Sequence, residues 1–237
     1  INNLGTLLHD QGKLDDAEAL YREALKGRRR VLGDKHQATL GSINNLGSLL
    51  IDQEKLDEAE PLLRQALEVS RRELGNEDLI SLSIINKLAR LLDAQGALDE
   101  AEPLFREALE GLRRKLGDEH PRTLTTIGRL WGILDAQGKY DDAEPLLREA
   151  LDVSRRNLGD EHPDTLTHIY NLGSLLQEQG KLDEAEQLFR EELDGCRHKL
   201  GDKHPDTLLS ISTLARLLKN QKKLDEAESL MREVVEG

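Results

Sequence analysis

The chain repeats itself with a fixed period of 42 residues, and this period limits the possible folds more than any other feature. Each step of the period brings back an isoleucine that opens a similar segment: Ile1, Ile43, Ile85, Ile127, Ile169 and Ile211. A chain of this kind folds as a quasi-linear array in which each unit contacts its neighbours. We therefore expect a single array over residues 1–237. Its repeats are 1–42, 43–84, 85–126, 127–168, 169–210 and a partial repeat at 211–237.

Each segment begins with a stretch whose apolar residues follow the spacing of one helix face. In the first segment this stripe includes Leu4 and Leu7, and the stretch stops at Gly12. A glycine at this place is typical of the left-handed residue that ends a helix. Glu54 and Lys222 replace this glycine in two segments, so we expect slightly strained turns there.

A second stretch with helical spacing follows and ends at Leu32. Asp15 and Glu18 have the spacing of a capping box at its start. Glu18 and Arg22 have the spacing of a favourable ion pair, and this pair recurs six times. Pro61 and its equivalents are expected in the first turn of this helix, where a missing N–H costs little.

Composition excludes several classes of function. The only cysteine, Cys196, rules out a disulfide framework and a thiolate zinc cluster. A net charge of −13 disfavours binding to nucleic acid or to anionic lipid. Aromatic residues are only 3% of the chain, so few side chains are available to stack on bases or sugars. The recurring loop histidine, His36 in the first repeat, is expected in a turn or cap. No phosphate loop, catalytic motif or metal spacing is present, so we expect a soluble cytoplasmic protein without catalysis, metal or cofactor.

The spacing of Leu4, Gly5, Ala17, Tyr21 and Ala24 resembles the tetratricopeptide repeat. The usual repeat has 34 residues, and the eight additional ones here are expected to lengthen the second helix and its exit loop. Repeats of 42 residues resemble those of the tetratricopeptide domain of kinesin light chains. They also look like the sensor ends of NB-ARC-type signalling ATPases. The resemblance implies an all-α fold, an α-solenoid in which six helix-turn-helix repeats form a right-handed superhelix.

The resemblance also implies that the first helices line a concave groove that binds peptides. Applying this to each repeat gives a set of candidate peptide-binding residues: Asn3, Asn44, Asn45, Ser48, Asn86, Lys87, Arg90, Arg129, Gly132, Tyr170, Asn171, Ser174 and Arg216. Asn3, Asn45 and Asn171 occupy the position where asparagines of the family clamp peptide backbone, since an amide both donates and accepts hydrogen bonds. The alternative is that these asparagines only satisfy neighbouring helix termini.

Positive charge gathers in the middle of this groove. Lys87, Arg90 and Arg129 form a basic centre in a chain of strongly negative net charge. Such a centre favours a partner with a short acidic stretch. The alternative is that these are ordinary solvated helix charges.

The fourth repeat departs from the pattern. Gly128 and Gly132 stand inside its first helix, and Trp131 replaces the small residue at which the hairpin packs. Each interior glycine costs roughly 1 kcal/mol relative to alanine. Trp131 could simply fill the space left by its glycine neighbours. Alternatively, the glycines leave a hole in the groove, walled by Arg90, Arg129 and Tyr170, that admits an anchoring side chain of the ligand.

The sequence therefore predicts a non-catalytic scaffold that binds a peptide segment of a partner protein, similar to cargo or adaptor recognition by kinesin light chains. Two alternatives stay open. One is head-to-tail self-assembly, because neither end of the array carries the polar capping helix that solenoids normally need; a longer parent array would explain the same ends. The other is a sensor segment of an NB-ARC-type signalling protein.

Overall fold

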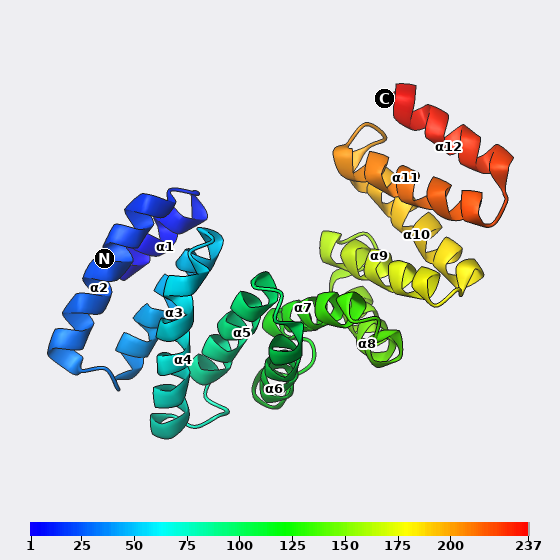
Figure 1. The fold of residues 1–237 in the computed structure, drawn as a ribbon. Helices are drawn as coiled ribbons and strands as arrows, with labels where there is room; N and C mark the ends of the chain where they lie inside the picture. The colour runs from blue at the N-terminus through cyan, green and yellow to red at the C-terminus, as the bar shows by residue number, and fades with distance from the viewer. Residues whose placement is uncertain (237) are drawn as a thin grey trace. The chain divides into compact units, whose positions relative to one another are not determined.

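The computed structural model describes residues 1–236, and within them the chain is entirely helical. Twelve helices follow one another without a strand in this range: α1 (Asn2–Asp10), α2 (Leu14–Leu32), α3 (Gln37–Asp52), α4 (Leu56–Glu73), α5 (Leu79–Ala94), α6 (Leu98–Leu116), α7 (Pro121–Ala136), α8 (Tyr140–Leu158), α9 (Pro163–Glu178), α10 (Leu182–Leu200), α11 (Pro205–Asn220) and α12 (Leu224–Glu236). The fold is an all-α solenoid of helical hairpins (Figure 1). None of these helices has both the length and the apolarity needed to cross a membrane.

The chain divides into two compact units, residues 1–133 and 134–237. In the first unit, α3 packs against α2, α4 and α5, and α5 also packs against α4 and α6. In the second unit, α9 packs against α8 and α10, and α11 packs against α10 and α12. Each odd-numbered helix is the first helix of a repeat. In both units such a helix packs against the second helix of the preceding repeat, as α3, α5, α9 and α11 do.

The first helices begin earlier than the sequence pattern predicted. From the second repeat on they have 16 residues, and α3 starts at Gln37, six residues before Ile43. The second helices are long as well, with 18 or 19 residues in the first five repeats, so the additional residues extend both helices of the repeat. A side-chain cap fixes each new start: the Nδ1 atom of His36 accepts a hydrogen bond from the Ala38 N–H at 3.1 Å. His120, His162 and His204 act in the same way, which confirms the expected capping role of these histidines.

The second helices also start differently from the prediction. α2 begins at Leu14 with Lys13 at the N-cap, and no side chain caps it. Asp15 and Glu18 therefore do not form a capping box. The predicted position of Pro61 was also wrong: it is the sixth residue of α4, beyond the first turn, so it removes one interior hydrogen bond.

The turns between paired helices match the sequence analysis. Gly12 has a φ of 74°, in the left-handed region. Glu54 (φ 60°) and Lys222 (φ 64°) adopt the same conformation without being glycine, as predicted. The Lys55 N–H donates to the Leu50 carbonyl at 2.8 Å, which closes the turn around Glu54. The hydrogen bonds of the turn thus hold this residue in the left-handed conformation even where it is not glycine.

The core lies between hairpins. Leu46, Leu49 and Leu50 of α3 are buried, with at most 1% of their surface exposed. Within the hairpin, Gly47 lets the Leu63 side chain of α4 approach closely: a Cβ at this glycine would lie 2.7 Å from Leu63 Cδ2. The small residue of the first helix therefore faces the large residue of the second, because the two backbones are too close for side chains on both sides.

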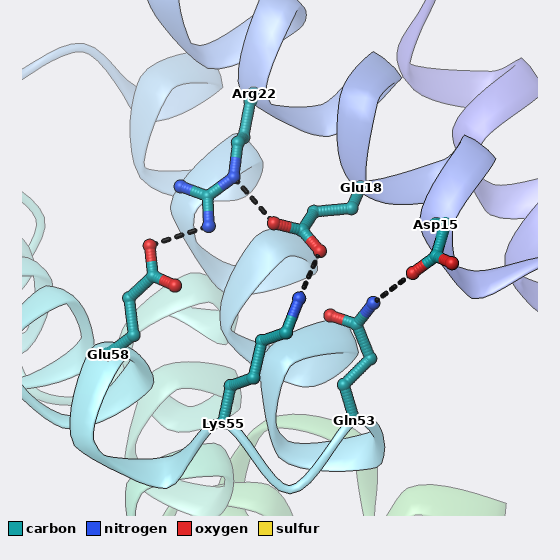
Figure 2. Close-up of polar contacts among 6 residues, drawn as sticks. All are labelled: Asp15, Glu18, Arg22, Gln53, Lys55 and Glu58. Carbon is teal, nitrogen blue, oxygen red and sulfur yellow. Dashed lines mark hydrogen bonds and ion pairs between the residues drawn. The ribbon is translucent and has the colours of Figure 1, made fainter.

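Ion pairs join the second helices on their exposed side (Figure 2). The Arg22 guanidinium donates to Glu18 at 2.8 Å within α2 and also to Glu58 of α4. Lys55 donates to the other oxygen of Glu18 at 2.7 Å. Cross-repeat pairs 36 residues apart recur within the two units: Arg22–Glu58, Arg64–Glu100, Arg148–Glu184 and Arg190–Glu226. The predicted pair within each second helix is confirmed, and in these four repeats the same arginine also pairs with a glutamate of the next repeat.

These contacts change the acidity of the central glutamate. The hydrogen bond from Lys55 and the neighbouring Arg22 lower the pKa of Glu18 from 4.5 to about 2. Lys181 and Arg148 lower the pKa of Glu144 to about 2 in the second unit. Both carboxylates favour the folded state in their ionised form, so their contribution is complete above pH 4.5 and is lost as the pH falls towards 2.

Glu18→Gln should therefore lower stability in a pH-dependent way. At neutral pH we expect a loss of about 1 kcal/mol in the free energy of unfolding. The difference from the wild type should shrink between pH 4.5 and about 2, measured by chemical denaturation at each pH. Glu23→Gln, an exposed position on the same helix, is the matched control and should show little effect. A loss that persists unchanged at pH 2 would contradict the ion-pair account.

Two glycine substitutions should have opposite effects. Both positions gain helix propensity from alanine, worth about 0.5–1 kcal/mol. At Gly132 the new Cβ meets no atom within 4 Å, so Gly132→Ala should stabilise the chain. At Gly47 the new Cβ lies 2.7 Å from Leu63 Cδ2 and 3.0 Å from its Cγ, so Gly47→Ala should destabilise it by about 1 kcal/mol or more. Equal shifts of the thermal midpoint would refute this packing description.

Candidate functional site

A hollow lined by polar and basic side chains lies between the first helices α5 and α7. Its volume is about 180 Å³. Each helix contributes four residues at helical spacing i, i+3, i+4 and i+7: Ser83, Asn86, Lys87 and Arg90 from α5, and Arg122, Thr125, Thr126 and Arg129 from α7. Residues at this spacing share one face of a helix. The two faces therefore meet along the line between adjacent first helices, which we call the seam.

Four of the eight lining residues are cations. Arg90 donates to Asp52 of α3 and, at 3.4 Å, to the Ser48 carbonyl. Arg122 makes a long contact of 3.5 Å to the Leu79 carbonyl. Within residues 1–236, neither Lys87 nor Arg129 forms an ion pair. Among the described residues, only Arg90 of the four cations has an ion-pair partner, Asp52, which His9 also contacts at 2.8 Å; Asp93 acts on Arg129 only at longer range.

The cations perturb one another. Burial, together with the charges of Arg90 and Arg129, lowers the pKa of the half-buried Lys87. Desolvation and Arg90 lower the pKa of Arg129, and desolvation lowers that of Arg122. All three shifts have the sign expected when cations lack anionic partners. An anion placed in the hollow would relieve this repulsion.

Hydrogen bonds between neutral side chains join successive first helices along the seam. Asn86 Oδ1 accepts a hydrogen bond from Thr126 Oγ1 at 3.3 Å, and Asn44 Oδ1 accepts one from Ser83 Oγ at the same distance. Each bond joins successive first helices. Asn44 and Asn86 therefore bond across to the next first helix through their oxygens.

The remaining predicted residues lie on first helices but outside the hollow. In the first unit, Asn3 and Gly132 are exposed, and Asn45 and Ser48 are half-buried. In the second unit, Tyr170, Asn171 and Ser174 are half-buried on α9, and Arg216 is exposed on α11. The contacts of Asn3, Asn45 and Asn171 do not decide between a peptide clamp and a structural role. Their role in peptide binding therefore stays a prediction.

The departures in the fourth repeat have a clear geometry. Trp131 is buried, with 8% of its surface exposed. The space above Gly128 and Gly132 is open, since a Cβ at either would meet no atom within 4 Å. No atom of Trp131 lies within 4 Å of the Cβ position at Gly128, so Trp131 does not fill the space directly above that glycine. The use of that open space by a ligand stays a prediction.

Sequence reasoning missed Arg122, Thr125 and Thr126. It placed them in a loop because the repeat was taken to begin at Ile127. The signal that could have found them is the His120-Pro121 dipeptide, since proline favours the first turn of a helix after an N-cap residue. With the helix starting at Pro121, Arg122 falls on the same face as Arg129.

The described residues show neither a metal-binding cluster nor a reactive cysteine. No group of three or more His, Cys, Asp or Glu residues with the geometry of a metal site occurs in the described part of the chain. Cys196 is buried, and burial raises the pKa of its thiol to about 11. A thiol of that pKa is a poor nucleophile at neutral pH.

Comparison with known proteins gives a consistent result. A tetratricopeptide-repeat family model matches residues 1–72, 39–114, 131–198 and 166–237. No curated protein matches the chain. The crystal structure of a putative kinesin light chain with nearly identical TPR-like repeats from Podosopora anserina is similar to this chain. It is 27% identical, with a TM-score of 0.76, and the match covers 84% of this chain and 94% of that one.

Two further solved structures share the fold. BtubC (BKLC) from P. vanneervenii is 23% identical, has a TM-score of 0.78, and the match covers 94% of this chain and 90% of that one. A signal transduction ATPase with numerous domains and a tetratricopeptide repeat sensor, from Pyrococcus horikoshii, is 15% identical with a TM-score of 0.81. That match covers 99% of this chain but 34% of the ATPase.

Removing one of the unpaired cations should stabilise the chain. Lys87→Met keeps the alkyl stem and removes the charge. We expect a gain of about 0.5–1 kcal/mol in the free energy of unfolding at low salt, which screening should reduce at about 500 mM NaCl. Lys26→Met, at an exposed position on α2, is the control and should change little. A lower thermal midpoint for Lys87→Met at low salt would contradict the proposed repulsion.

Proposed function

Because the chain belongs to the tetratricopeptide-repeat family, we propose that it binds a segment of a partner protein along the faces of its first helices. The repeat array is a scaffold suited to protein–protein interaction. In this proposal the partner contributes an acidic residue at the hollow between α5 and α7. Cargo or adaptor recognition of the kinesin-light-chain kind is the specific role that we propose, in the cytoplasm and without catalysis or cofactor.

The observation that supports an acidic partner is the excess of cations in the hollow. The chain as a whole carries a charge of −13, yet Lys87 and Arg129 face the hollow without anionic partners in the described range. Charge complementarity of this kind selects partners and speeds association more than it adds affinity. We therefore expect a partner segment with one or two Glu or Asp residues at this position, flanked by residues that lie along the adjoining helix faces.

The open space over Gly128 and Gly132 adjoins the same face of α7. We propose that a side chain of the bound segment enters there. Gly132→Leu would fill this space while keeping the helix, so it should weaken partner binding without lowering the thermal midpoint. Because Gly132 is exposed, the substitution leaves the buried core unchanged.

A peptide-binding assay tests the charge proposal. Fluorescently labelled peptides rich in Glu, with Gln-substituted peptides of equal length as controls, are titrated with the full chain. We expect micromolar affinity, roughly −8 kcal/mol, for the acidic peptides. Lys87→Glu combined with Arg129→Glu should weaken binding at least about tenfold, equivalent to about 1.4 kcal/mol. Lys26→Glu, which changes the net charge on α2 away from the hollow, should leave it almost unchanged.

Three outcomes would overturn this proposal. One is equal binding of the acidic and Gln peptides. Another is equal weakening by Lys26→Glu, which would mean that only net charge matters. The last is insensitivity of acidic-peptide binding to salt, since exposed charge interactions must weaken as the Debye length falls to about 3 Å at 1 M.

Self-assembly is the alternative role. Leu4 and Leu7 of α1 are about half exposed, at 51% and 52%. The equivalent leucines of α3 are buried by neighbouring hairpins, so a further hairpin would cover this surface in the same way, supplied by a second copy of the chain in this proposal or by a preceding repeat of a longer array. Light scattering over a range of protein concentrations separates the two roles. A monomer at all concentrations would exclude assembly and leave the peptide-binding proposal intact.

A further inference from the structure

A second hollow occupies the seam between α9 and α11 in the other unit. Its volume is about 290 Å³, and helix α10 forms its third side. Thr167 and Tyr170 line it at the positions that Ser83 and Asn86 hold two repeats earlier. The same structural seam is therefore used twice, once in each unit, with different side chains.

The chemistry of the two hollows is opposite. Asp206 stands where the first hollow has Arg122, and the exposed Leu209 stands where it has Thr125. On the second helix, Glu192 occupies a position that is alanine in all four preceding repeats: Ala24, Ala66, Ala108 and Ala150. The second hollow is thus acidic and apolar where the first is basic and polar.

Glu192 is buried without a cation. Only 7% of its surface is exposed. Ser210 Oγ donates to Glu192 Oε1 at 2.7 Å, and the Cys196 thiol lies 3.4 Å from the same oxygen. The other oxygen, Oε2, is buried and has no hydrogen-bond partner among the described residues. Lys199 also lines the hollow but forms no ion pair within residues 1–236.

A buried carboxyl group without a cation and with one unpaired oxygen destabilises the folded protein. Removing a carboxylate from water without a compensating charge is unfavourable, and an unpaired oxygen adds the loss of a hydrogen bond. Burial accordingly raises the pKa of Glu192, and the nearby Asp206 acts in the same direction. The first-unit equivalent, Ala108, carries none of this cost. A ligand that brings a positive charge and N–H donors would remove it.

We propose that this hollow binds an alkylammonium group, the chemistry of a lysine side chain on a partner protein. The alkyl stem would lie against Leu166, Leu209 and the Tyr170 ring. The ammonium group would lie beside the Glu192 carboxyl group, and Asp206 at the rim would add attraction. The proposal does not depend on the acidic-segment hypothesis, because the residues that carry it lie in the other unit.

An NMR titration of the full chain tests the inference with small probes. The ligand is n-pentylammonium, which reproduces the stem and charge of lysine, and n-pentanol is its neutral control. Backbone amides of Gly195, Cys196 and Ser210 report on the hollow. We expect saturable shifts at these amides with the ammonium ion, and binding at least tenfold weaker with the alcohol.

Variants then assign the binding to the carboxyl group. Glu192→Gln keeps the size and the acceptor for Ser210, and should weaken ammonium binding at least tenfold. Glu192→Ala, which restores the residue of the other repeats, should do the same. Glu178→Gln removes a charge from an exposed position of α9 outside the hollow and should leave binding unchanged. Unperturbed amide spectra of the variants away from the hollow confirm that they remain folded.

The probes also separate this inference from the proposed function. A lysine-containing peptide should compete with n-pentylammonium at Ser210, whereas Lys87→Glu with Arg129→Glu should not affect the titration. The inference is overturned if the shifts do not saturate, if n-pentanol binds as well as the ammonium ion, or if Glu192→Gln retains wild-type affinity. Each of these results leaves the acidic-peptide assay unaffected.

Discussion

Burial of each first helix between neighbouring hairpins is the interaction on which the rest of the structure depends. Leu4 and Leu46 occupy the same position of the repeat, yet 51% of Leu4 and only 1% of Leu46 is exposed. The difference comes from the neighbours: α3 packs against α2, α4 and α5, whereas α1 packs mainly against α2. No single hairpin can bury this face, so stability arises at the contacts between repeats. The ion pairs between second helices, such as Arg22 with Glu58, add a smaller stabilisation to repeats that are held together mainly by their buried apolar faces.

The same stacking creates the seams in which the two proposed binding sites lie. Two successive first helices leave a line of positions that neither the hairpin core nor the ion-pair network needs. Residues in the seam therefore differ between repeats: Arg122 and Asp206 occupy equivalent positions. The core positions, in contrast, are almost the same in every repeat. A partner that matches both seams would carry an acidic group for one unit and a basic group for the other. Such a pairing would favour one partner over the many peptides that match only one seam.

The period was sufficient to predict the fold, because a 42-residue repeat with helical spacing permits few alternatives, and it also predicted the left-handed turns at Glu54 and Lys222. Local chemistry was predicted less well. Asp15 and Glu18 have the spacing of a capping box, but Lys55 from the next repeat pairs with Glu18 instead, and an inter-repeat contact cannot be derived from one segment. The basic centre was identified in part through Lys87, Arg90 and Arg129, while Arg122 was missed with the start of its helix. Glu192 was overlooked because it lies on a second helix, although its departure from an alanine column was visible in the sequence.

Amide hydrogen exchange on the full chain, with and without Leu88→Ala, tests the nearest-neighbour account most directly. Leu88 is buried in α5, and its truncation should cost about 2–5 kcal/mol locally. If stability resides in contacts between adjacent repeats, amide protection should fall in α4, α5 and α6 and stay at the wild-type level in α9 to α12. An equal loss of protection in all of these helices would mean that the chain unfolds as one cooperative body, and would contradict the account.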